Sequence, residues 1–69
     1  MGALITEAIS NFFNGPALEQ MAAQIEGIIS EGGASIGNAI IDVLVGAGVP
    51  MAEAEVASEA IVIGLAVAA

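Results

Sequence analysis

The amino-acid sequence predicts an all-α fold, with short amphipathic N-terminal helices followed by an apolar helical hairpin. Apolar residues recur at a spacing near 3.6 rather than 2, which is typical of helices. Turn residues cut the chain into four pieces, each long enough for one helix. Because 69 residues form at most one small domain, we expect residues 1–69 to be a single helical subunit.

The first two pieces, 3–13 and 16–31, are predicted to form amphipathic helices. Pairs of apolar residues recur every four positions in the first piece, and polar residues fill the opposite face. Asn14 is placed to cap the second helix, with Pro16 in its first turn, where a missing N–H does no harm. The pair Gly32-Gly33 is a typical helix stop.

The last two pieces, 34–49 and 51–69, are far more apolar and form the predicted hairpin. The helix over 34–49 has one narrow polar stripe, so we expect it to be buried on most sides. Asp42 is its only charge, and Glu59 stands just before a run, 60–69, that has no polar side chain. Both Asp42 and Glu59 are therefore candidates for buried carboxylates.

The charge pattern conflicts with the apolar composition. The sequence has no Lys, Arg or His against eight acidic residues, for a net charge of −8, yet it is 58% hydrophobic. It is rich in Ala and Gly, so we expect a lone chain to have too few large side chains for a dense core. Regular self-assembly would bury apolar helix faces between subunits and keep carboxylates in water. The expected subunit contacts are Leu4, Ile5, Ile9, Phe12, Phe13, Ile36, Ile40, Val43, Leu44, Ile61, Ile63 and Leu65.

The missing cations also exclude several functions. Direct nucleic-acid contact and binding to anionic membranes both depend on Lys and Arg. Nucleophilic catalysis needs a His or Lys base, so we expect no enzyme and no catalytic residue. The chain has no Cys or His for zinc, no EF-hand spacing for calcium, and no glycine pattern that binds nucleotides. We expect no metal and no cofactor.

In outline the chain is similar to the pilins of conjugative type IV secretion pili. The likeness lies in a chain of this length with an amphipathic N-terminal part and two small-residue-rich apolar helices, 34–49 and 51–69, joined around Pro50. The resemblance implies an extracellular or cell-surface helical tube of many copies, packed with phospholipid and able to pass DNA. In that family the helix–helix loop is often basic, whereas this chain has Glu53 and Glu55 there.

Two other functions fit the same composition. The helical coat of a filamentous or rod-shaped virus would use the same packing, with another cation neutralising the genome. A secreted membrane-active peptide is the third reading, although such peptides usually carry basic residues on the polar face. A bound genome would separate the first two readings, and leakage of lipid vesicles would support the third.

An assembly of this chain should be more stable in mild acid than in mild alkali. Carboxyl groups crowded together without a cation hold their protons to higher pH than they do in the free chain. Because the extra protons are bound in the assembled state, its stability falls as the pH rises through that range. A thermal-melting series over pH measures this directly, and a higher melting temperature in alkali would contradict it.

Overall fold

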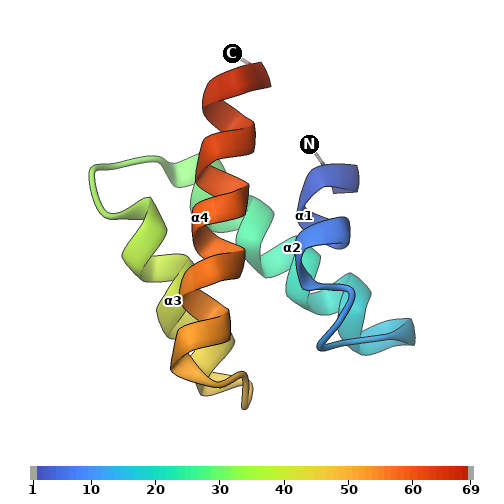
Figure 1. Ribbon diagram of the computed structural model, residues 1–69. Coiled ribbons are helices and arrows are strands. Elements are labelled where there is room, and N and C mark those ends of the chain that lie inside the picture. Colours follow the sequence, from blue (N-terminus) through green and yellow to red (C-terminus); the bar gives the residue numbers. More distant parts are fainter. Residues whose placement is uncertain (1, 69) are drawn as a thin grey trace.

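The computed structural model describes residues 2–68 and the side chains of residues 3–67. Within that range the chain forms four α-helices and no strand, which confirms the all-α prediction (Figure 1). The helices are α1 (Gly2–Ile9), α2 (Gly15–Glu31), α3 (Ile36–Gly46) and α4 (Met51–Ala68). Each corresponds to one of the four predicted pieces.

Helix α1 is shorter than predicted and ends at Ile9 rather than at residue 13. The backbone N–H groups of Phe12 and Phe13 both donate to the Ile9 carbonyl, at 3.0 and 3.3 Å, and close a turn. The Ser10 hydroxyl donates to the Glu7 carbonyl at 3.0 Å. Ser and Asn compete with helix hydrogen bonds through such local contacts, so the apolar spacing alone overestimated the helix.

The ends of α2 follow the predicted turn residues. Asn14 takes the N-cap position in an extended conformation, and Pro16 lies in the first turn of the helix. The Asn14 side chain makes no capping hydrogen bond. The backbone carbonyl of Asn14 instead accepts from the Leu18 N–H at 3.4 Å. At the other end Gly32 has φ 75°, and its N–H donates to the carbonyls of Ile28 and Ile29. The left-handed φ explains why the helix stops at a glycine.

The turn between α3 and α4 reverses the chain in four residues. The N–H of Val49 donates to the Leu44 carbonyl at 3.0 Å, and that of Gly48 donates to the Val45 carbonyl at the same distance. Gly48 has φ 104°, a conformation that side chains with a Cβ rarely adopt. Val49 is buried, so the turn is held to the core as well as by hydrogen bonds. Pro50 then precedes α4 and accepts from the Ala54 N–H.

The four helices pack as a closed ring of neighbours. α1 contacts α2, α2 contacts α3, α3 contacts α4, and α4 contacts α1. α3 and α4 run antiparallel side by side, and α1 lies along the C-terminal half of α4 (Figure 1). The apolar character predicted for this pair covers only part of α4, whose first half carries three acidic residues. Assembly of the pair into a filament stays a prediction.

The core is built from aliphatic side chains of all four helices. Its six large members with no exposed surface are Ile5, Ile9, Ile25, Ile40, Leu44 and Ile61. Smaller residues, among them Ala54 and Ala57 on α4, fill the space between them. The expectation that a single chain would have too few large side chains for a core is therefore wrong. Small residues let the helices approach closely, so a few large side chains are enough.

Ser58 is buried within this apolar core and is fully satisfied. Its hydroxyl donates to the Gly37 carbonyl at 2.8 Å and so joins α4 to α3. A Cβ on Gly37 would lie 3.7 Å from the Ser58 oxygen, which is ordinary contact distance. The two backbones are thus close enough for a side chain as short as serine to bridge them. A buried hydroxyl without such a partner would be costly.

The overall dimensions are those of a self-contained globular domain. The radius of gyration is 10.7 Å, against about 11 Å expected for a folded chain of this length. The accessible surface is 4108 Å², against roughly 3,900 Å² for a folded monomer of this mass. A single copy therefore buries as much of its surface as small soluble domains normally do.

Replacing Gly48 with alanine should lower the free energy of unfolding by about 1 kcal/mol, because the new Cβ is strained at its positive φ. Gly46→Ala is the matched control, since Gly46 ends α3 without a positive φ and has open space around it. That variant should be as stable as the parent or more so. Chemical unfolding of both variants measures the difference, and equal losses would contradict the role given to Gly48.

Candidate interaction surface

The eight carboxylates all lie exposed on the outside of the protein. One is on α1, three are on α2, one is on α3 and three are on α4: Glu7, Glu19, Glu26, Glu31, Asp42, Glu53, Glu55 and Glu59. They are spread over the surface, and nowhere in the described residues do three acidic groups come close enough to hold a metal ion.

The candidates for buried carboxylates, Asp42 and Glu59, are both exposed in the single chain. Asp42 lies on the side of α3 away from Ile40 and Leu44, which face the core. Glu59 follows Ser58 on α4 but points outward, because successive helical residues are turned by about 100°. Within the single chain, the narrow polar stripe turns α3 so that the charge of Asp42 reaches water. Burial of either carboxylate between copies stays a prediction.

The twelve expected subunit contacts divide into three groups. Ile5, Ile9, Ile40, Leu44 and Ile61 are fully buried inside the chain. In this fold they stabilise the subunit itself and cannot touch a second copy, so the expectation of subunit contact does not hold for these five.

Six others are half-buried on the edge of the core. Phe12, Phe13, Ile36, Val43 and Leu65 pack against the buried cluster. Leu4 covers Gly64 of α4: a Cβ built on Gly64 would lie 2.5 and 2.8 Å from the two Leu4 δ-carbons. Contact between these six residues and a second copy, through the part of each side chain that is exposed, stays a prediction. Only Ile63 among the twelve is mainly exposed, with 55% of its surface in water.

Ile63 belongs to an apolar stripe along the outer face of α4. Val56, Ala60, Ile63 and Val67 are spaced by four, three and four residues, which places them on one side of the helix. Val56 is 69% exposed and Val67 is 81% exposed. The contacts expected from the sequence did not include Val56, Ala60 or Val67. Their spacing was visible there, but α4 is so uniformly apolar that the spacing could not show which face turns outward.

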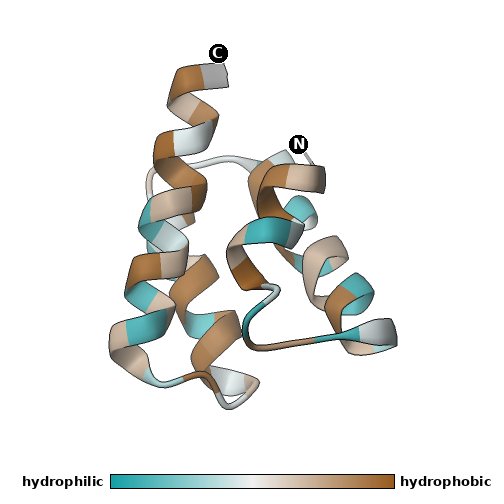
Figure 2. Ribbon diagram, turned by 45° about the vertical axis from the view of Figure 1, so that its right-hand side comes forward, coloured by the Kyte–Doolittle hydropathy of each residue, from teal (hydrophilic) through white to brown (hydrophobic). Residues whose placement is uncertain are grey.

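The charge on α4 is confined to its first half. Glu53, Glu55 and Glu59 lie there, whereas 60–68 has no charged or polar side chain. Figure 2 shows this division as hydrophilic colour in the lower turns of α4 and hydrophobic colour toward its C-terminal end. The stripe therefore begins between carboxylates and ends in an uncharged region. We call Val56, Ala60, Ile63 and Val67 the outer stripe.

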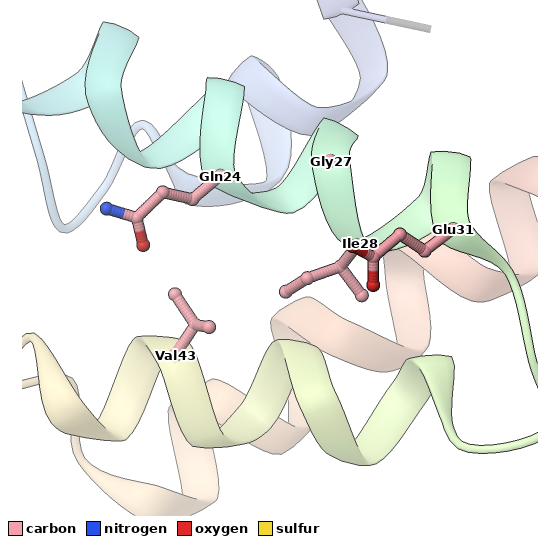
Figure 3. Close-up of a pocket in the computed structure, with 5 residues that line it drawn as sticks. All are labelled: Gln24, Gly27, Ile28, Glu31 and Val43. Atoms are coloured by element: carbon pink, nitrogen blue, oxygen red, sulfur yellow. The ribbon is translucent and has the colours of Figure 1, made fainter.

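An open groove of about 340 Å³ lies between α2 and α3. It is lined by Gln24, Gly27, Ile28, Glu31 and Val43. Figure 3 shows Gln24, Ile28 and Glu31 along α2 and Val43 pointing from α3 toward α2. The groove is shallow and open to solvent. Its two polar side chains, those of Gln24 and Glu31, do not converge on a common point.

None of the helices within residues 2–68 is both long enough and apolar enough to cross a membrane. No protein-family model matches the chain, and comparisons with curated proteins and with solved structures found no match either. The function of this protein is therefore inferred from its own surface. Its two distinctive features are the unpaired carboxylates and the outer stripe.

The contact between Leu4 and Gly64 can be tested with a pair of helix glycines. Gly27→Ala should raise the free energy of unfolding by about 0.5–1 kcal/mol, because alanine favours the helix and the site is open. Gly64→Ala should be less stable than Gly27→Ala by about 1 kcal/mol, because the new methyl group displaces Leu4. Urea unfolding measures both. Equal stabilisation by the two changes would show that α1 does not pack closely on α4.

Proposed function

We propose that this protein is a structural subunit that assembles with many copies of itself into an extracellular filament. The observation that carries the proposal is the outer stripe, because it gathers three of the six exposed large hydrophobic side chains of the described residues on one side of α4, including the two most exposed, Val56 and Val67. Contiguous exposed apolar surface on a folded protein typically marks a site of association.

The charge pattern supports a structural role over a chemical one. Every carboxylate lies on the surface, and the sequence offers no cation to pair with it. A surface of a single sign keeps free copies soluble and apart until apolar contacts bring them together.

The pilin-like tube, the cell-surface location and bound phospholipid belong to the proposal through the resemblance in chain outline. The compact fold adds one condition to that picture. Since α3 and α4 are already packed into a closed four-helix body, copies would meet through their outer faces as folded units. Side chains of the core would take no part in the contacts between them.

Assembly should strengthen with salt and with acid. Each copy carries a net charge of −8, and repulsion between copies is screened over about 8 Å at physiological ionic strength. Lowering the pH toward the isoelectric point of 4.1 removes the charge itself. Sedimentation velocity and negative-stain electron microscopy, over a series of salt concentrations and pH values, measure the size and the form of the assembly.

Filaments that grow with salt and shorten in alkali would support the proposal. A single-chain mass under all of these conditions would overturn it, as would assembly that weakens as salt is added. Filaments that contain nucleic acid would replace the pilin-like proposal with a virion coat. Nuclease digestion of the purified material separates these two cases.

A further inference from the structure

We infer that the outer stripe binds the outer stripe of a second copy, with the two α4 helices antiparallel. This inference rests on the proposed function and specifies one of its contacts. The alternation of four- and three-residue steps in the stripe is the spacing of a coiled-coil seam, in which apolar side chains of one helix insert between those of another. The stripe is also straight and unobstructed, because α1 and α3 cover the other sides of α4.

The distribution of charge along α4 favours an antiparallel over a parallel arrangement of the two helices. A two-fold axis between residues 61 and 62 would bring Val56 opposite Val67 of the second copy, and Ala60 opposite Ile63. In that register Glu59 lies at the level of Gly64 of the second copy, and Glu55 lies near the end of that copy's α4. The antiparallel arrangement therefore places Glu59 beside uncharged turns of the other α4 and keeps Glu53, Glu55 and Glu59 away from their own copies.

A parallel pair would have the opposite effect. It would place Glu53, Glu55 and Glu59 beside their own copies, three like-charged pairs with no cation in the protein to relieve them. Like charges at one contact oppose binding and disfavour that arrangement. Because a two-fold contact uses the same patch on both partners, the stripe needs no other surface to complete it.

Other partners fit the stripe less well. An anionic membrane or a nucleic acid would be repelled by a protein that has no basic side chain. A basic protein would be drawn to the carboxylates, but these are spread over all four helices, whereas the stripe continues into the part of α4 that has none. The uncharged half of a second α4 is the surface that matches it.

Such a contact closes a pair and cannot by itself extend a filament. Because a two-fold interface is satisfied by two copies, a filament of these pairs would need a second surface on each copy. The pair and the filament can therefore be tested separately. Pairs without filaments would leave this inference standing and would remove the proposed function. Filaments without the α4 contact would do the reverse.

Cysteine cross-linking tests the direction, and the natural chain has no Cys to interfere. Val56→Cys and Val67→Cys are prepared separately, then treated with a short bis-maleimide alone and as an equal mixture. Both positions are exposed, so neither change should disturb the fold. An antiparallel pair predicts a covalent dimer in the mixture and little from either variant alone. Gln20→Cys, exposed on α2, measures cross-linking by random collision.

Efficient cross-linking of each variant alone, without mixing, would show a parallel pair and overturn the inference. Cross-linking of the mixture at the level of Gln20→Cys would overturn it as well. So would binding of single copies to neutral lipid vesicles through α4 in place of pairing.

A charge in the seam tests the contact energetically. Ile63→Glu should weaken pairing by about 100-fold or more, because it places two carboxylates at the centre of the seam. Ala17→Glu, at an exposed position in the first turn of α2, adds the same charge away from the seam and should change pairing little. Circular dichroism and thermal melting show whether both variants keep the fold. Equal loss of pairing in the two variants would overturn the inference.

Discussion

Every ionised carboxylate of this protein must stay hydrated, because the sequence contains no basic side chain that could form an ion pair with it. Burying an unpaired carboxylate costs far more than the few kcal/mol by which a small domain is stable. All eight carboxylates are accordingly exposed, and the helices turn their remaining faces inward. The interior is left to aliphatic side chains and to a single hydroxyl, that of Ser58, which the Gly37 carbonyl satisfies.

The fully buried core contains no charged group and no aromatic ring. Its helices must therefore approach closely if small aliphatic side chains are to fill the space between them. The Ser58 hydroxyl of α4 reaches the Gly37 carbonyl of α3, and Gly64 leaves room for Leu4 to lie over α4. Alanines at 54 and 57 serve the same purpose along α4. The high content of small residues therefore has a use inside the single chain. It does not by itself require packing between chains.

The order of the helices and several of their ends could be predicted from the sequence. What covers each apolar helix face could not. The helix stop at Gly32 and the turn before Pro50 depend on neighbouring residues alone and were predicted correctly. Ile40 and Ile63 look alike in the sequence, yet one is fully buried and the other is mainly exposed. Periodicity shows that a face is apolar. It does not show whether another helix of the same chain or another molecule covers it.

The same constraint that shapes the interior also limits how strongly copies can bind one another. Burying the outer stripe would remove aliphatic surface from water, a gain of about 25 cal/mol per Å² that salt hardly changes. Bringing two copies together also brings eight charges on each toward eight on the other, and this cost depends on salt and pH.

Along α4 the two effects are separated in space, because the carboxylates stop before the last two turns while the stripe continues into them. An interface centred on residues 60–63 therefore keeps most of the apolar gain at the least electrostatic cost. The proposed contact would therefore form and separate as ionic conditions change. That is a useful property in a subunit that must stay soluble alone and join others where they are concentrated.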